Sequence, residues 1–291
     1  MKKILITGSN GQLGSEIRAL AASYPDFRFV YTDVDELDLT NRAAIQDLFD
    51  REHVDVCVNC AAYTAVDKAE DDRDLALLIN ATAVEYLARE CAAHHIVLVH
   101  VSTDYVFDGT HHQPYVETDA PSPNSYYGLT KLAGEKAVQK YAETAIILRT
   151  AWLYSAFGNN FVKTMLRLGK ERDSLEVVVD QIGTPTYAGD LAKAILDLVA
   201  NDKIKNQKVE LYHYSNEGVI SWYDFAKAIM REAGVDCQVN AIESKDFPAK
   251  ANRPFYSVLN KAKIKSAGGV EVPYWLDSLT KVIRQLKTGN L

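Results

Sequence analysis

The sequence predicts an α/β fold in which a parallel sheet is covered by helices on both faces. Strand-like and helix-like segments alternate through the first 150 residues, as expected of parallel strands joined by right-handed crossovers. The strand-like segments are apolar throughout, which is typical of a sheet buried on both faces. A glycine-rich turn joins the first strand-like segment to the first helix-like one.

Each element follows from the hydrophobic periodicity of the chain. Thr40 is the expected N-cap of the second helix, because its hydroxyl can accept a hydrogen bond from a free backbone N–H group. In the first half, the predicted strands are residues 3–7, 27–33, 55–60, 96–102 and 145–149, and the predicted helices are residues 12–23, 41–51, 74–94 and 125–141.

The pattern loosens after about residue 150, and seven of the eight prolines lie beyond residue 110. We therefore expect a smaller C-terminal α/β lobe that builds a pocket. The division is residues 1–150, with returning segments from later in the chain, and residues 151–291 for most of the lobe. Here the predicted strands are residues 176–179 and 209–212, and the predicted helices are residues 160–170, 189–199, 221–233 and 275–286.

The composition excludes several classes of protein. Among 291 residues, 32 basic and 39 acidic side chains give a net charge of −7, so no basic excess exists to neutralise nucleic acid. The apolar runs are far short of the ~20 residues that span a bilayer, and the apolar N-terminal run is too short for a signal peptide. We expect a cytoplasmic protein with neither nucleic acid nor membrane as its partner.

The four cysteines are too few for a disulfide scaffold in a chain of this length. Cys57 and Cys60 spell CxxC, but they lie on a predicted buried strand, where residues three apart point to opposite faces. No second cysteine pair completes a zinc site. We therefore interpret both as core residues.

The glycines at positions 8, 11 and 14 form a GxxGxxG motif between the first strand and the first helix. Such glycines allow a tight turn and let the backbone approach a pyrophosphate, which the helix N-terminus then attracts. Asp33 ends the second strand, 19 residues after Gly14. Its carboxylate can bind a ribose 2′-OH and would repel a 2′-phosphate. The motif predicts a Rossmann-type doubly wound parallel sheet that binds NADH or NADPH, with NADH favoured by Asp33.

Tyr127 and Lys131 spell YxxxK and share one face of a predicted helix. A phenol is a weak acid at neutral pH, and an ammonium group one turn away is expected to lower its pKa. Thr103 ends the strand before this helix, and sites in such sheets form at the carboxyl ends of strands. A second YxxxK, Tyr223 to Lys227, has no such partner. We predict that Tyr127 is catalytic and Tyr223 structural.

The glycine motif, Thr103 and the Tyr127/Lys131 pair together resemble the extended short-chain dehydrogenase/reductase superfamily. Finer strings are similar to members that reduce a dTDP-linked 4-keto sugar, over nearly the whole chain and most densely in residues 1–190. The resemblance implies an oxidoreductase that uses NAD(P)H to reduce the C4 ketone of dTDP-4-dehydro-L-rhamnose to dTDP-L-rhamnose, the last step of dTDP-rhamnose synthesis. Those strings are residues 59–70, 102–109, 127–135 and 158–166, and Arg253-Pro254.

The resemblance also implies the role of individual residues. Thr103 would orient the ketone, Tyr127 would donate the proton, and Lys131 would hold the nicotinamide ribose. Cofactor-binding residues would be Gly8, Asn10, Gly11, Gln12, Leu13, Gly14, Asp33, Asp38, Leu39, Ala61, Ala62, Tyr63, Ser102, Tyr127 and Lys131. Substrate-binding residues would be Thr103, Asp104, Trp152, Asn160 and Arg253.

Several alternatives stay open. Trp152 could be a core aromatic residue, and Arg253 could form a surface ion pair. Some superfamily members bind Mg²⁺ at a dimer contact, to which Glu16 and Asp190 correspond, but Gly189 stands where those members carry another acid. We therefore expect no metal and leave a homodimer open. Alternative functions are a nucleotide-sugar epimerase or dehydratase, and a non-catalytic regulatory subunit on the same fold.

Overall fold

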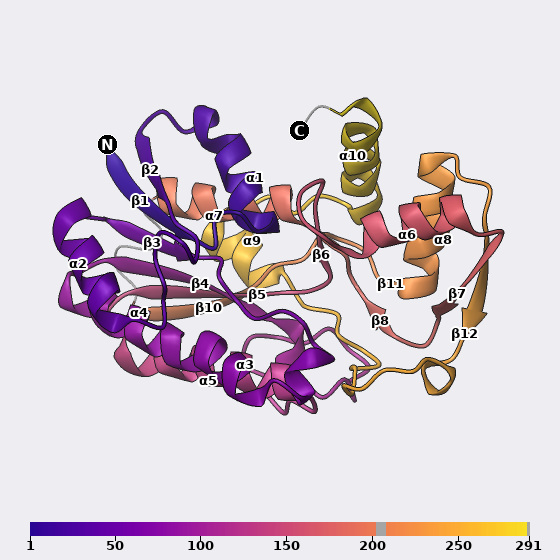
Figure 1. Cartoon of the computed structure of the whole chain (residues 1–291), viewed down its shortest axis with the longest axis horizontal. Helices are drawn as coiled ribbons and strands as arrows, with labels where there is room; N and C mark the ends of the chain where they lie inside the picture. The colour runs from indigo at the N-terminus through magenta and orange to yellow at the C-terminus, as the bar shows by residue number, and fades with distance from the viewer. Residues whose placement is uncertain (202–207, 290–291) are drawn as a thin grey trace.

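Six parallel strands form the central sheet of the computed structural model, which describes residues 1–201 and 208–289 (Figure 1). Their order is β10-β5-β4-β3-β1-β2. After β1 the chain goes outward to β2 and then returns to β3 on the other side of β1. The carboxyl ends of β1 and β3 therefore form the topological switch point, where open α/β sheets bind ligands. The strands are β1 (Lys2–Thr7), β2 (Phe27–Tyr31), β3 (Val56–Asn59), β4 (Val97–Thr103), β5 (Ala145–Thr150) and β10 (Val209–His213).

Helices cover both faces of this sheet, which confirms the predicted α/β class (Figure 1). On β1, Ile4 and Ile6 face one apolar cluster and Leu5 faces the other. Cys57 and Cys60 likewise lie on opposite faces, and both are free thiols. The first face carries α1 (Gln12–Leu20), α7 (Ala188–Ala200) and α9 (Ala262–Gly268), and the second carries α2 (Arg42–Glu52), α4 (Ala83–Ala93) and α5 (Tyr126–Tyr141).

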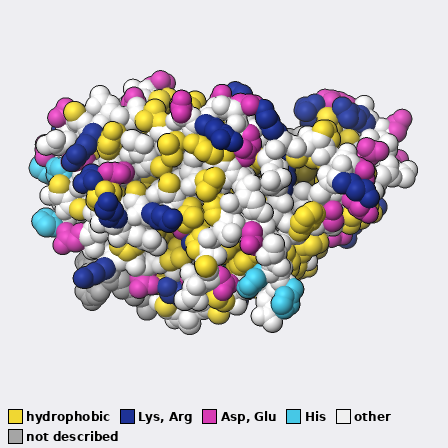
Figure 2. All heavy atoms as spheres, turned by 90° about the horizontal axis from the view of Figure 1, so that it is seen from below, with side chains coloured by type: hydrophobic (Ala, Val, Ile, Leu, Met, Phe, Trp, Pro, Cys, Tyr) yellow, Lys and Arg dark blue, Asp and Glu magenta, His cyan; other side chains and the backbone are white. Residues whose placement is uncertain are grey.

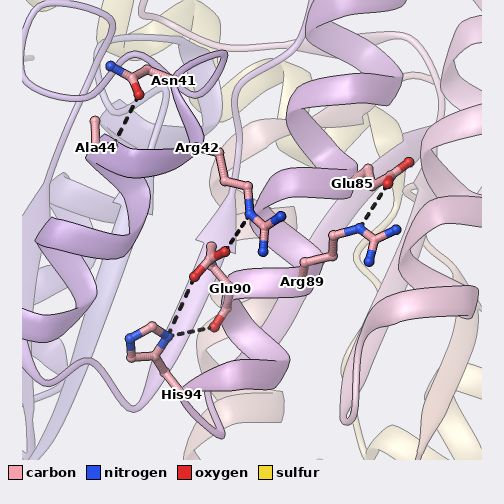
Figure 3. A network of polar contacts seen from close by, with 7 residues as sticks. All are labelled: Asn41, Arg42, Ala44, Glu85, Arg89, Glu90 and His94. Atoms are coloured by element: carbon pink, nitrogen blue, oxygen red, sulfur yellow. Dashed lines mark hydrogen bonds and ion pairs between the residues drawn. The ribbon is translucent and has the colours of Figure 1, made fainter.

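Helix α2 begins one residue later than the sequence suggests. The prediction that Thr40 caps this helix was wrong. The side chain of Asn41 caps it instead, by accepting a hydrogen bond from the backbone N–H of Ala44 at 3.3 Å (Figure 3). Arg42 in the first turn then reaches across to α4, where its Nε lies 2.7 Å from Glu90 Oε1. The cap thus also places the cation that joins α2 to α4.

A π-helical segment interrupts the long helix predicted over residues 74–94. The structure has α3 (Arg73–Leu77), the π segment η3 (Leu78–Thr82) and then α4. The prediction from apolar spacing did not include this break. Such π segments are frequently found at functional sites.

Helices α6, α8 and α10 build a second, smaller lobe around their own apolar cluster. Figure 2 shows a notch in the upper edge of the outline between this lobe and the body. Within the described residues, no helix is both long and apolar enough to span a bilayer. The lobe contains α6 (Phe161–Glu171), α8 (Trp222–Ala233), α10 (Trp275–Thr288), β6 (Leu153–Tyr154), β7 (Ser174–Val178), β8 (Ile182–Gly183), β9 (Thr186–Tyr187), β11 (Ile220–Ser221) and β12 (Gln238–Ile242).

The second half of the chain also returns to the body. Strand β10 pairs with β5, α7 packs against α1, and α9 packs against β10. The boundary near residue 150 stays a prediction.

Sequence periodicity missed β6, β8, β9, β11, β12 and α9, most of which are too short to show a pattern. Short helical turns complete the fold: η1 (Ala21–Ser23), η2 (Lys68–Glu70), η4 (Asp104–Val106) and η5 (Ser244–Asp246).

A buried ion pair fixes α5 to the sheet. Arg149 on β5 donates from Nε and Nη2 to the two carboxylate oxygens of Glu135 on α5, at 2.8 and 2.7 Å. Both side chains are almost completely buried, with 3% and 1% of their surfaces exposed. Glu135 lies one and two turns after Lys131 and Tyr127, so the pair sets the depth at which that helix face meets the sheet.

We predict that Glu135→Gln lowers the free energy of unfolding by roughly 3–5 kcal/mol, because it leaves the Arg149 charge buried without its counterion. Urea unfolding followed by circular dichroism measures this. Glu135→Gln/Arg149→Met is the matched variant, and it should recover part of the loss because no unpaired charge remains. A single variant within 1 kcal/mol of the parent protein would contradict the role given to the pair.

Candidate active site

The glycine turn after β1 lies directly against the segment that follows β3. Gly8 has φ +60°, and a Cβ there would lie 2.7 Å from the backbone of Ala61. Only glycine fits this close approach without strain. Beyond the turn, Gly11 is the N-cap of α1 and provides no side-chain cap. The first N–H groups of α1 therefore remain available to an anion, which is the arrangement that a dinucleotide pyrophosphate needs.

Asp33 ties the end of β2 to this turn. Its Oδ2 accepts a hydrogen bond from the Asn10 N–H at 2.9 Å, and its Oδ1 accepts one from the Val34 N–H at 2.9 Å. Each carboxylate oxygen still has a lone pair left for a ribose hydroxyl. The side chain is thus partly structural, which the motif alone did not indicate.

A cavity of about 500 Å³ opens at the switch point, and we name it the switch-point cavity. The segment after β2 contributes two carboxylates and three apolar side chains, and apolar residues from α3, η3 and α4 complete the lining. This combination suits an adenosine, whose base is flat and whose ribose is polar. Its lining includes Gly8, Gly11, Asp33, Asp38, Leu39, Cys60, Ala61, Ala62, Leu75, Leu78 and Ile79.

A second cavity of about 570 Å³, the central cavity, holds the predicted catalytic residues. Thr103 ends β4, while Tyr127 and Lys131 project from the first two turns of α5. Ser125 caps α5, and a Cβ on Gly128 would lie 2.2 Å from the Tyr105 carbonyl oxygen, so glycine lets the helix approach the strand end. The lining also includes Gly11, Gln12, Leu13, Cys60, Ala62, Ser102, Asp104, Trp152, Asn160, Phe161 and Trp222.

Hydrogen bonds and burial set the protonation of these groups. Burial raises the pKa of Tyr127 above its ordinary value, and a hydrogen bond with Thr103 opposes the shift. Thr103 Oγ1 donates to Asp104 Oδ1 at 3.0 Å, and burial raises the pKa of Asp104 to about 6. Burial also lowers the pKa of Lys131 to about 8. At neutral pH the phenol therefore carries its proton and the lysine its charge.

The expected lowering of the Tyr127 pKa by Lys131 does not dominate here. Lys131 Nζ donates instead to the Val101 carbonyl oxygen at 2.7 Å, and burial decides the direction of the Tyr127 shift. The raised pKa leaves the phenol protonated at neutral pH but makes it a weaker acid, so transfer of its proton depends on stabilisation of the phenolate by the nearby Lys131 charge.

A third cavity of about 730 Å³, the lobe cavity, lies among α6, β7 and the segment after β12. Arg253 lines it, pairs with Asp67 and donates to the Tyr105 hydroxyl at 3.3 Å. Arg253 thus forms the ion pair that was left open, and at the same time faces a cavity. Other lining residues are Phe161, Met165, Leu168, Arg172, Glu176, Gln181, Trp222, Ile242, Phe247 and Pro248.

The three cavities lie next to one another, because neighbouring cavities share lining residues. Gly11, Cys60 and Ala62 line both the switch-point and the central cavity, and Phe161 and Trp222 line both the central and the lobe cavity. The series brings the predicted cofactor, catalytic and substrate residues together, with the catalytic group in the middle.

Three predicted cofactor residues do not line these cavities. Asn10 donates its N–H to Asp33, and Gly14 lies under the turn, where a Cβ would come within 2.5 Å of Ser9. The Tyr63 hydroxyl donates to Asp72 at 3.0 Å. All three therefore support the shape of the site, and direct contact with a cofactor stays a prediction for them.

Asn80 is a site residue that sequence reasoning missed. From the π segment, its side chain accepts from the Tyr63 N–H at 2.9 Å and donates to the Tyr63 carbonyl at 3.0 Å. It also donates to Thr130 Oγ1 at 3.1 Å, which ties the loop after β3 to α5. Only the helix break, invisible in the sequence, points to it.

The acidic residues considered for Mg²⁺ have protein partners. Glu16 accepts hydrogen bonds from Ser155 at 2.6 Å and Tyr187 at 3.0 Å, and Asp190 accepts one from Asn216 at 2.7 Å. Over residues 1–201 and 208–289, no group of three or more His, Cys, Asp or Glu side chains is placed to hold a metal ion.

Comparison with known proteins agrees with this geometry. A dTDP-4-dehydrorhamnose reductase of Aggregatibacter actinomycetemcomitans is 41% identical over 289 residues, which cover 97% of this chain and 98% of that protein. The crystal structure of a dTDP-4-dehydrorhamnose reductase from Clostridium acetobutylicum superimposes with a TM-score of 0.93 at 44% identity, covering 98% of this chain and 99% of that one.

A third relative shows a cofactor. The dTDP-4-dehydrorhamnose reductase of Bacillus anthracis, solved in complex with NADP, superimposes with a TM-score of 0.91 at 38% identity and covers 98% of this chain and 100% of that one. The family model described as the RmlD substrate binding domain matches residues 1–288. From these matches, with which the three adjacent cavities agree, we conclude that the chain belongs to the RmlD substrate binding domain family.

Proposed function

We propose that this chain is an NAD(P)H-dependent oxidoreductase that reduces the C4 ketone of dTDP-4-dehydro-L-rhamnose to dTDP-L-rhamnose, the last step of dTDP-rhamnose synthesis. The observation that carries the proposal is the series of three cavities with Thr103, Tyr127 and Lys131 in the middle one. The dinucleotide would occupy the switch-point cavity and reach into the central cavity, and the dTDP moiety would occupy the lobe cavity. The reacting carbon of the sugar then meets the nicotinamide beside Tyr127.

Each residue of the central cavity has a role that follows from its chemistry. A bound reduced nicotinamide supplies the hydride. Tyr127 holds its proton through the raised pKa and delivers it to the oxygen that gains charge at C4. The Thr103 hydroxyl, which donates to Asp104 at 3.0 Å, is placed to turn toward the ketone oxygen. The Lys131 charge stabilises the phenolate that remains after proton transfer.

The cofactor preference rests on Asp33. Its carboxylate lines the switch-point cavity, where it can bind a ribose 2′-OH and would repel a 2′-phosphate. We therefore propose NADH as the favoured cofactor of this chain, with NADPH as the alternative because the Bacillus anthracis relative was solved with NADP. A cytoplasmic location and a homodimer stay predictions.

We predict that Tyr127→Phe lowers kcat by about 10²- to 10⁴-fold, because the proton donor is lost while the ring still fills its place. Oxidation of NADH or NADPH by dTDP-4-dehydro-L-rhamnose measures turnover, and its net consumption separates a reductase from an epimerase or dehydratase. Tyr223→Phe, in the second YxxxK, is the matched control and should keep its activity. Normal turnover by Tyr127→Phe would overturn the assignment.

We predict that Asp33→Asn lowers the ratio of kcat/KM with NADH to kcat/KM with NADPH by about tenfold. The amide keeps an acceptor for the Asn10 N–H, but the negative charge is lost. That charge both repels a 2′-phosphate and strengthens the hydrogen bond to a 2′-OH. Asp38→Asn removes a second carboxylate of the same cavity and controls for net charge. An unchanged ratio in Asp33→Asn would show that this carboxylate does not select the cofactor.

We predict that kcat/KM falls as the pH rises through about 8, the pKa to which burial lowers Lys131. Lys131 is charged below this pH and neutral above it, whereas the raised pKa of Tyr127 keeps the phenol protonated across this range. A pH–rate profile of the parent protein and of Lys131→Met tests the origin of the fall. The same alkaline fall in Lys131→Met would exclude Lys131 as its cause.

A further inference from the structure

Trp152 has a backbone conformation that bulky residues avoid. Its φ is +48°, and among the described residues the other non-glycine residues with positive φ are His53 and His95. Those two follow the ends of α2 and α4, where left-handed residues commonly end helices. Trp152 instead lies between β5 and β6, in the wall of the central cavity. Such strain persists only where the surroundings hold the residue in place.

The side chain of Trp152 stacks on that of Trp222. The two indole rings stack with centroids 3.6 Å apart and planes 12° apart. Behind Trp152, a Cβ on Gly183 would lie 2.7 Å from its ring, so only glycine leaves room for it there. The Trp152 carbonyl also accepts a hydrogen bond from the Thr186 N–H at 3.2 Å. The indole of Trp152 is thus in close contact with both Trp222 and Gly183.

Trp222 itself is anchored by the start of α8. It is the first helical residue, and the residue before it, Ser221, forms a capping box with Asp224. Ser221 Oγ accepts from the Asp224 N–H at 3.0 Å, and Asp224 Oδ2 accepts from the Ser221 N–H at 2.9 Å. Phe161, at the start of α6, packs on the Trp222 ring with centroids 4.6 Å apart. The Trp222 indole therefore has little freedom to move.

Trp222 also stands where two cavities meet. It lines the central cavity together with Trp152, and it lines the lobe cavity together with Arg253. In the function proposed above, the sugar lies on one side of this indole and the nucleotide on the other. A substrate that fills both cavities must pass the Trp222 ring.

We propose that Trp222 is a positioning residue that holds Trp152 in its left-handed conformation. It thereby fixes the position of the bound sugar ring relative to Tyr127. This inference rests on the proposed function and adds a specificity device to it. In the proposed function, a sugar joined through phosphates to a nucleotide lies on both sides of Trp222. The residue thus couples nucleotide recognition in the lobe cavity to the position of the reacting carbon.

The test compares Trp222→Leu and Trp222→Phe with Tyr223→Leu. Tyr223 is the next residue of α8 and also packs on the lobe core, but it lines an outer groove instead of the three cavities. For Trp222→Leu we expect kcat with dTDP-4-dehydro-L-rhamnose to fall on the order of 10- to 100-fold, since a small misplacement of the reacting carbon has effects of this size. The cofactor Kd should stay within about twofold, as the cofactor residues are untouched. Trp222→Phe should recover part of kcat.

Circular dichroism provides a readout that does not depend on the reaction. Stacked indoles give an exciton couplet, which we expect in the parent protein and in Tyr223→Leu but not in Trp222→Leu. A parent protein without the couplet, or a loss confined to the substrate KM, would overturn the positioning role. If the parent protein does not reduce the dTDP-linked ketone, the proposed function fails. The couplet still shows in that case whether Trp152 and Trp222 stack. If Trp222→Leu does not fold, Trp222→Phe decides by its kcat.

Discussion

The active site depends on a buried ion pair at some distance from the chemistry. Glu135 and Arg149 join α5 to β5 through two short hydrogen bonds, and α5 carries Tyr127 and Lys131 on the same face as Glu135. Other hydrogen bonds also hold α5, from Lys131 to the Val101 carbonyl oxygen and from Asn80 to Thr130. The ion pair adds a two-point contact between charged groups, so it helps to fix the position of the proton donor relative to the strand end.

The sequence was most informative where function needs residues close together along the chain. The glycine turn, Asp33 and the Tyr127/Lys131 pair are local patterns, because a turn, a strand end and one helix face each fit within a few residues. The parallel body could be predicted for the same reason, as its strands are long enough to show their burial. The structure places the Gly8 turn at the switch point and Thr103 beside Tyr127.

Residues that act through tertiary contacts could not be predicted in this way. Trp222 and Phe161 come from different helices of the lobe, and nothing in their local sequence shows that they meet at the junction of two cavities. Asn80 required a π segment that apolar spacing does not reveal. The sequence also did not show how deeply Tyr127 is buried, so the expected shift of its pKa had the wrong direction. The cap at Asn41 shows the usual uncertainty of helix ends.

The path of the chain has a consequence for how the molecule assembles. Strand β10 completes the sheet beside β5, yet it lies some 60 residues further along the chain than β5. Until it arrives, β5 has an unpaired edge that could associate with other chains. During synthesis the N-terminal residues therefore cannot complete the central sheet until β10 has been made. A nascent chain that ends before β10 would leave this edge of β5 exposed to pairing with other chains.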